Sequence, residues 1–140
     1  MATGKLTARS FGVAADDWHV IQTARPNVLL IGPDAAVAGF LELLMPLLEP
    51  PVVEIAEGQF ALPAQSGGTI ILRDVSRLDA DGQQQLSDWL TEPERRTRVI
   101  STSPYPLYPF VERNALSATL YYTLNVIMLT LREPSQNNGH

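Results

Sequence analysis

The 140-residue chain has no cysteine and two histidines, His19 and His140, and these shortages restrict its chemistry. Without cysteine there is no disulfide and no thiolate metal site, which is compatible with the cytosol. Two histidines supply neither a metal cluster nor a Ser-His-Asp constellation, so we expect no metal ion. No apolar run reaches the roughly 20 residues of a membrane-spanning helix, and Met1 to Ser10 does not resemble a signal peptide. We therefore expect a cytoplasmic protein without membrane contact.

Positive charge is scarce and unevenly placed. The net charge is −5, and no lysine or arginine occurs between Pro26 and Leu72. The acidic residues of the same interval are Asp34, Glu42, Glu49, Glu54 and Glu57. Direct DNA binding is not expected, because an electrostatic grip on nucleic acid needs clustered basic residues. A triphosphate would also meet repulsion along this interval.

The chain is organised around Gly67 to Val75, a turn followed by an apolar, β-branched run that ends in Arg73 and Asp74. A continuous apolar run is typical of a parallel strand covered on both faces, and the paired glycines supply a tight entry turn. The two charged residues then lie at the carboxyl end of a buried strand. Ligands bind at this end of open α/β sheets, so it is the place to look for chemistry.

A strand, a loop and an amphipathic helix precede this run. Asn27 to Ile31 is apolar and ends at Gly32-Pro33, and the next apolar residues follow helical spacing, namely Val37, Phe40, Leu41 and Leu44. Asp34 is a candidate N-cap, and Pro46 should end or kink the helix because proline has no amide hydrogen.

Further elements extend the pattern to most of the chain. Short strands are predicted at Val52 to Ile55, beside the first strand, at Val99 to Ser103 and at Val126 to Leu131. Helices are predicted at Asp16 to Ala24 and from a cap at Asp79 to about Leu90. Prolines and tyrosines between residues 104 and 109 indicate an irregular connector. Arg95, Arg96 and Arg98 form either a solvated strand entrance or a site for an acidic partner.

We therefore predict one α/β domain with three layers and a mainly parallel central sheet. Residues 1–25 are expected to be an N-terminal extension or adaptor, and Met1 to Ala15 are expected to be either loosely held or an adaptor. Residues 26–133 form the core, and residues 134–140 are a polar disordered tail.

The segment Gly67 to Val75 resembles the Walker B motif of AAA+ domains in NtrC-type bacterial activators of the sigma-54 RNA polymerase, which reads Gly-Gly-Thr-Leu-Phe-Leu-Asp-Glu-Ile. The resemblance implies a P-loop-NTPase-like core, here without the helical lid. In that family the aspartate supports magnesium and the glutamate activates water. Arg73 and Asp74 stand at those two positions, and a cation cannot ligate magnesium.

The aligned P-loop segment is altered as well. The motif Gly-x-x-x-x-Gly-Lys-Ser/Thr surrounds phosphates with backbone amides and holds them with lysine. Gly32 is kept, but Ala38 replaces the lysine and Gly39 the hydroxyl residue, while Pro33 lacks an amide and Asp34 adds negative charge. An ordinary turn between a strand and a helix is the favoured interpretation of this degenerate loop.

Leu116 to Val126 matches the family's Phe-Arg-Glu-Asp-Leu-Tyr-Tyr-Arg-Leu-Asn-Val without a gap, and its apolar positions should pack. The two arginines that reach a neighbour's nucleotide in the family are Ser117 and Thr123 here. Ser103 stands where the sensor I motif carries asparagine. Only Ala56 to Ser66 replaces the long interval with the family's Gly-Ala-Phe-Thr-Gly-Ala loop, so the usual contact with the sigma factor is not expected.

These substitutions favour a non-catalytic AAA+-like domain that binds no cofactor and acts through protein contacts in bacterial transcription or signalling. The expected partner is an AAA+ activator or a second copy of the chain, and the expected surface includes Ser103, Ser117 and Thr123. One alternative is a residual ATP-binding or ATPase domain in which Arg73 compensates for the lost lysine. Another is a sensor that binds a small molecule at the end of the sheet.

Overall fold

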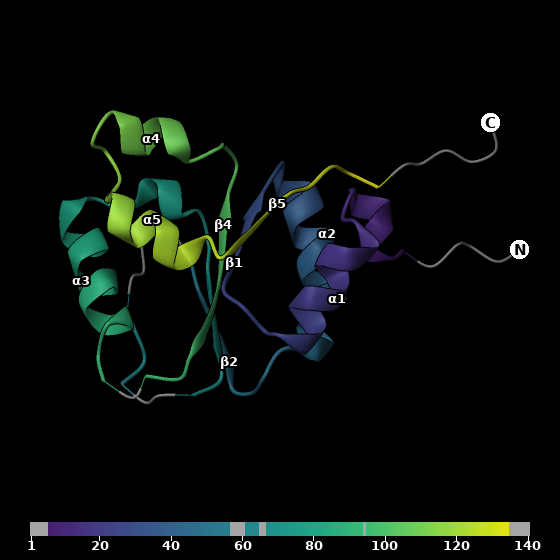
Figure 1. Cartoon of the computed structure of the whole chain (residues 1–140), viewed down its shortest axis with the longest axis horizontal. Helices are drawn as coiled ribbons and strands as arrows, with labels where there is room; N and C mark the ends of the chain where they lie inside the picture. Colours follow the sequence, from purple (N-terminus) through teal and green to yellow (C-terminus); the bar gives the residue numbers. More distant parts are fainter. Residues whose placement is uncertain (1–5, 57–60, 65–66, 94, 135–140) are drawn as a thin grey trace, which may run out of the picture.

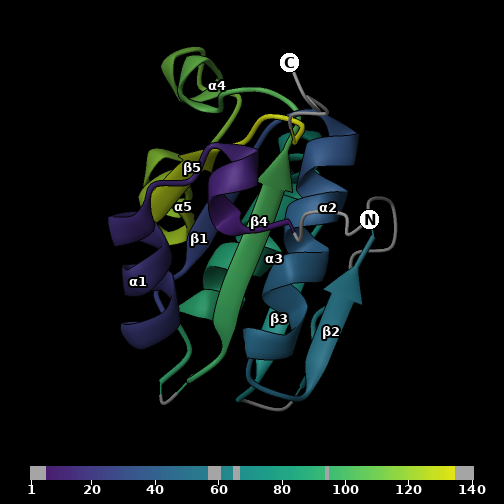
Figure 2. The same cartoon turned by 90° about the vertical axis from the view of Figure 1, so that its right-hand side faces the viewer.

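The sheet of this protein has five strands that all run parallel. The computed structural model describes residues 6–56, 61–64, 67–93 and 95–134. The strands are β1 (Val28–Ile31), β2 (Val52–Ile55), β3 (Thr69–Leu72), β4 (Arg98–Ser103) and β5 (Ile127–Thr130). Their order is β2-β3-β4-β1-β5 (Figure 2). The predicted α/β class with a parallel sheet is confirmed.

Helices cover both faces of the sheet, which gives the three predicted layers (Figure 1). One layer contains η1 (Ala8–Phe11), α1 (Ala15–Thr23), α2 (Asp34–Leu44) and the short η2 (Met45–Leu47) that follows it. The other contains η3 (Val75–Arg77), α3 (Ala80–Leu90), α4 (Tyr108–Glu112) and α5 (Ala118–Leu124). A parallel sheet needs this double cover because both of its faces are apolar.

One predicted neighbour is wrong. β2 does not lie beside β1 but at the edge of the sheet, where it pairs with β3 in the register Ile55↔Leu72. Both sides of β1 are already occupied, by β4 on one side and β5 on the other. The chain therefore crosses from β1 to the outer edge and then returns inward through β3.

The turn into β3 has the predicted geometry. Gly67 and Gly68 both have positive φ angles, of 100° and 73°, a region that glycine enters without steric cost. A Cβ on Gly68 would collide with the carbonyl of Pro51. That carbonyl instead accepts a hydrogen bond from the amide of Thr69 at 3.0 Å. The four residues of β3 are all buried, as predicted.

Helix α2 has the predicted apolar face and the predicted end. Its buried residues include the four with helical spacing, Val37, Phe40, Leu41 and Leu44. The α-helix stops at Leu44, before Pro46. Asp34 is not the N-cap, since Pro33 occupies that position and Asp34 is already the first helical residue. By contrast, Asp79 caps α3 as predicted and accepts a hydrogen bond from the amide of Gly82 at 2.8 Å.

The prediction that Met1 to Ala15 is loosely held is wrong for the part that the structure describes. Ala8, Phe11 and Val13 are buried in the same apolar cluster as β1 and α2. The ring of Phe11 packs edge-on against Phe40, with 5.7 Å between ring centroids, and fills the space beside Gly39 that a side chain would occupy. We call residues 6–13 the N-terminal strap.

Two residues of the predicted arginine cluster, Arg95 and Arg98, fit neither of its two interpretations, whereas Arg96 is exposed. Arg98 is buried and donates hydrogen bonds to the carbonyls of Pro26 at 2.8 Å and Ile21 at 3.1 Å. Burial lowers the pKa of Arg98, with a smaller lowering by Arg25 and an opposing effect of Glu49. Arg95 stacks on the ring of Trp89 at 4.0 Å. Both guanidinium groups hold elements of the fold together.

The second half of the chain differs from the prediction at two places. The connector after β4 is not irregular throughout, because α4 begins at Tyr108 with Pro109 in its first turn, where proline is tolerated. Val126 does not pack, and is 61% exposed. The other predicted apolar positions, Leu120, Tyr121 and Leu124, are buried on α5. The predicted tail at residues 135–140 lies outside the described residues.

We predict that the effect of Gly39→Ala on the free energy of unfolding changes sign when Phe11 is replaced by alanine, because the Phe11 ring fills the space beside Gly39. Phe11→Ala should lower the free energy of unfolding by about 3–5 kcal/mol because it removes a buried ring. Gly39→Ala alone should destabilise, since its Cβ would lie 2.9 Å from a ring carbon of Phe11. In the Phe11→Ala background the same change should stabilise by about 0.5–1 kcal/mol, because alanine favours helix. Chemical denaturation measures all three variants, and equal effects in both backgrounds would contradict the packing described.

Candidate functional site

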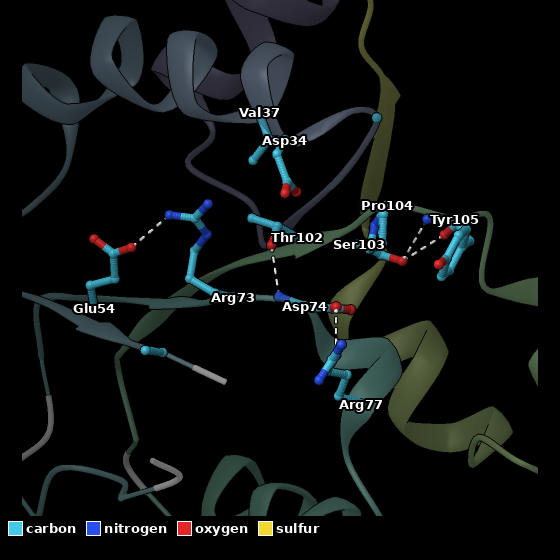
Figure 3. A pocket seen from close by; sticks show the side chains of 12 residues that line it. Asp34, Val37, Glu54, Arg73, Asp74, Arg77, Thr102, Ser103, Pro104 and Tyr105 are labelled. Carbon is cyan, nitrogen blue, oxygen red and sulfur yellow. Dashed lines mark hydrogen bonds and ion pairs between the residues drawn. The ribbon is translucent and has the colours of Figure 1, made fainter. Parts of the chain in front are cut away.

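A cleft of about 480 Å³ lies at the carboxyl ends of the strands (Figure 3). Its walls come from the start of α2, the ends of β2, β3 and β4, and the residues that follow β4. The lining residues are Gly32, Asp34, Val37, Glu54, Ala56, Arg73, Asp74, Arg77, Thr102, Ser103, Pro104 and Tyr105. The sheet topology makes this cleft, because parallel strands bring all their carboxyl ends to one edge.

Arg73 extends from the end of β3 toward β2 and not into the middle of the cleft. Its guanidinium forms an ion pair with Glu54 at 2.8 Å (Figure 3), and the two side chains are 31% and 46% exposed. The pairing follows from the register of β2 on β3, in which the amide of Arg73 bonds the carbonyl of Ile55 at 3.0 Å. Arg73 therefore already has an anionic partner from the protein.

Asp74 is held in a left-handed backbone conformation, with φ 52° and ψ 69°. Its amide donates to the hydroxyl of Thr102 at 2.8 Å, which joins the end of β3 to the end of β4. Its carboxylate accepts a short hydrogen bond from Ser76 and lies 3.4 Å from the guanidinium of Arg77. The side chain is thus fixed from two sides within its own turn.

The connection between β1 and α2 has only two residues, Gly32 and Pro33. The amide of Gly32 bonds the carbonyl of Ser103 at 3.1 Å. A Cβ on Gly32 would lie 2.8 Å from the carbonyl oxygen of Leu131. Close packing against the residue that follows β5 therefore requires a glycine at this position. The helix begins at Asp34, and the amide of Val37 already bonds the carbonyl of Pro33 at 3.0 Å.

The predicted site residues separate into two groups. Gly32, Asp34, Arg73, Asp74 and Ser103 all line the cleft, whereas Ala38 and Gly39 do not. Ala38 is exposed on α2, and Gly39 faces the N-terminal strap. The ungapped alignment with the P-loop thus places its last residues on a different side of the helix.

The residues predicted as an interaction surface do not form one surface. Ser103 is buried, and its hydroxyl donates to the carbonyl of Tyr105 at 2.6 Å. Ser117 caps the start of α5 by accepting a hydrogen bond from the amide of Leu120 at 3.2 Å. Thr123 lies in the last turn of α5, where its hydroxyl donates to the carbonyl of Thr119 at 2.9 Å. Only Ser103 lies at the cleft.

Sequence reasoning missed Glu54, Arg77 and Tyr105 as cleft residues. The available signal for Glu54 was its place in the penultimate position of a strand, because neighbouring parallel strands end at one edge. With these residues included, the charged groups that line the cleft are the carboxylates of Asp34, Glu54 and Asp74 and the guanidinium groups of Arg73 and Arg77. Among the described residues, no group of three or more His, Cys, Asp or Glu could hold a metal ion.

Comparison with known proteins identifies the family. A model of the Sigma-54 interaction domain matches residues 19–133. The chain belongs to this family. It is therefore an AAA+ domain of the sigma-54 activator type, which confirms the resemblance seen in the sequence. No curated protein matched the chain.

Solved structures support the same fold. NtrX from Brucella abortus in complex with ATP is similar with a TM-score of 0.67 and 14% identity, covering 82% of this chain and 33% of NtrX. Its complex with ADP gives 0.65 and 14%, covering 81% and 33%. The P-loop NTPase domain of the sigma-54 transport activator from E. coli gives 0.58 and 17%, covering 80% and 94%. This chain thus spans about a third of the length of NtrX. In the described part of the chain, no helix combines the length and apolar character needed to cross a bilayer.

We predict that the hydrogen bond between Asp74 and Thr102 holds the floor of the cleft. Thr102→Val should lower the free energy of unfolding by about 1–3 kcal/mol, because the Asp74 amide loses its acceptor while the side-chain shape is kept. Thr102→Ser keeps the hydroxyl and is the matched control. Hydrogen exchange followed by NMR should show faster exchange of the Asp74 amide in the valine variant only, and similar exchange in both variants would contradict this role.

Proposed function

We propose that this domain is a nucleotide-independent member of its family that acts through protein contacts and not by hydrolysing ATP. The observation that carries the proposal is the two-residue connection between β1 and α2. A P-loop needs four residues between its two glycines so that backbone amides can surround the phosphates. Here Asp34 to Val37, which the alignment assigns to that loop, are wound into the first turn of α2.

The charges around the cleft support the same proposal. A triphosphate needs cations, and Arg73 is already paired with Glu54 at 2.8 Å while the Arg77 guanidinium lies 3.4 Å from the carboxylate of Asp74. Asp34 adds a carboxylate at the start of α2, where phosphate would have to approach. Magnesium requires oxygen ligands, and Arg73 stands where the family has its aspartate. The residues present therefore do not fit a magnesium nucleotide.

The segment that supplies catalytic arginines in the family also lacks cations. Ser117 and Thr123 use their hydroxyl groups within α5, as a cap and as a bond to the preceding turn. Neither side chain can supply the positive charge that stabilises phosphoryl transfer in a neighbouring subunit. The proposed partner is a protein, either a complete AAA+ activator or a second copy, in bacterial transcription regulation. We propose no direct DNA contact.

Two other functions have an observation in their favour. The cleft itself favours a small-molecule sensor, since its volume of about 480 Å³ lies in the range of ligand pockets. The position of Arg73 at the cleft favours residual ATP binding, in which its guanidinium would leave Glu54 for a phosphate. Both functions require a ligand to stabilise the folded protein, which makes them testable together.

We predict no binding of ATP with magnesium. A site with a dissociation constant one hundredth of the ATP concentration would stabilise the protein by about 2.7 kcal/mol, and we expect no such shift in thermal unfolding and no binding heat in calorimetry. NtrX from Brucella abortus, which has been crystallised with ATP and with ADP, is the positive control.

The variant Arg73→Ala separates this proposal from residual ATP binding. It removes a partly exposed ion pair and should cost less than about 1 kcal/mol of stability. Neither the wild-type domain nor the Arg73→Ala variant should show a thermal shift or binding heat with ATP. Micromolar ATP binding that Arg73→Ala weakens would instead support the residual nucleotide site and overturn the proposal.

We also predict that contact with a complete sigma-54 activator from the same host uses the exposed side of α5. Tyr122 is 60% exposed there, and aromatic side chains often dominate interface energies. Tyr122→Asp should weaken the complex at least about tenfold, which corresponds to about 1.4 kcal/mol. Val20→Asp on α1, in the opposite helical layer, is the control. Biolayer interferometry with purified proteins measures the affinity of each complex. An activator that does not bind the wild-type domain, or that binds Tyr122→Asp and Val20→Asp equally well, would contradict this contact.

A further inference from the structure

The two edges of the sheet differ in how they are protected against pairing with another strand. β2 carries Glu54 and follows Pro50 and Pro51, and a charge and prolines both hinder strand addition. From Asn125 to Leu131, around β5, there is neither a charged residue nor a proline. Within the described residues, β5 pairs with β1 alone. Among the described residues, its outer edge therefore has no strand partner and carries no charge or proline that would hinder one.

The hydrogen bonds of β5 show which of its backbone groups are open. The amides of Ile127 and Leu131 bond the carbonyls of Asn27 at 3.2 Å and Ile31 at 2.7 Å, toward β1. Because successive residues of a strand alternate in direction, the backbone groups of Val126, Met128 and Thr130 face outward. The next outward amide, that of Arg132, is already bonded to the carbonyl of Phe11 in the N-terminal strap at 3.0 Å.

The side chains of the same three residues share one exposed face. Leu129 and Leu131 pack into the cluster on the α2 side, so the alternate residues project to the other face. Val126 is 61% exposed, Met128 is 45% exposed and Thr130 is exposed. Two apolar side chains and one threonine thus form a short exposed surface beside this edge.

We propose that this edge pairs antiparallel with the same edge of a second copy of the chain, with Met128 opposite Met128. The chain is acidic, with a net charge of −5, so two copies repel one another over most of their surface. The uncharged edge of β5 is a place where identical strands can meet without placing like charges opposite each other. The pairing is two-fold symmetric and closes at two copies, unlike a head-to-tail ring.

Symmetry and the N-terminal strap together select this register. Residues directly opposite in an antiparallel pair have side chains on the same face of the sheet. A two-fold axis normal to the sheet keeps each face and passes between two copies of one residue, which can face outward or inward. An inward residue at the centre, Ile127 or Leu129, would pair only two of the three outward residues. The longest pairing therefore has an outward residue at its centre. If Thr130 were at the centre, Met128 would pair with Arg132, whose amide is already bonded to the carbonyl of Phe11. If Val126 were at the centre, Met128 would pair with Leu124, which is in α5. Met128 remains, with Val126 opposite Thr130.

The absence of cysteine makes the register directly testable. In a Met128→Cys variant the two new thiols would lie opposite each other in a hydrogen-bonded pair, with Cα atoms about 5.5 Å apart. A disulfide accepts Cα separations of about 4.4–6.8 Å. In a Val126→Cys variant the two thiols would be separated by four residues along the strands, about 14 Å. Val126 is more exposed than Met128, so the Val126→Cys variant controls for disulfides that form by random collision.

We expect mild oxidation to give a disulfide dimer of Met128→Cys at least about tenfold faster than of Val126→Cys. A short edge buries less than the about 800 Å² per partner of stable complexes, so the uncross-linked dimer should be reversible and concentration-dependent. In analytical ultracentrifugation at high protein concentration, Met128→Lys should abolish this dimer, whereas Val53→Lys on the edge formed by β2 should leave it intact. Equal oxidation rates of the two cysteine variants, or a dimer that survives Met128→Lys, would overturn the proposal. The cleft is not involved, so ATP binding and this pairing stand or fall separately.

Discussion

The constraint on which this structure depends is that the inner strands of a parallel sheet must be covered on both faces. All residues of β1, β3 and β4 are buried, so each face needs its own helical layer. That requirement sets the crossovers, and the crossovers bring the strand ends to one edge. The position of the cleft is thus a consequence of the packing.

Packing also determines the connection between β1 and α2. A loop that binds phosphate must leave backbone amides unsatisfied until the ligand arrives. Here the helix starts two residues after β1, so the amide of Val37 is bonded within the protein. Gly32 is retained for a packing reason, since a side chain there would meet the carbonyl of Leu131. Gly32 in this aligned segment therefore has a role in the packing of the fold.

Much of the fold could be predicted from the sequence, because β3 and α2 have local signals in apolar runs, helical spacing and turn residues. Some errors are local, such as the N-cap assigned to Asp34, and others concern partners distant in the chain. Phe11 lies in a short polar stretch, and its burial depends on the missing side chain of Gly39. Arg98 is held by the carbonyls of Pro26 and Ile21, which no local pattern reveals. For the site, the ion pair of Arg73 with Glu54 follows only from the pairing of β2 with β3, and the prediction placed β2 elsewhere.

The N-terminal strap links the core packing to the edge of the sheet. Phe11 is anchored in the cluster around α2, and its carbonyl accepts the outward amide of Arg132 just beyond β5. The strap therefore limits the length of open strand as well as covering an apolar face. An unlimited edge would permit several registers and open-ended association. Because one end of the edge is closed by the strap and the other by α5, only a short, centred pairing remains, which is the condition for a finite two-fold assembly.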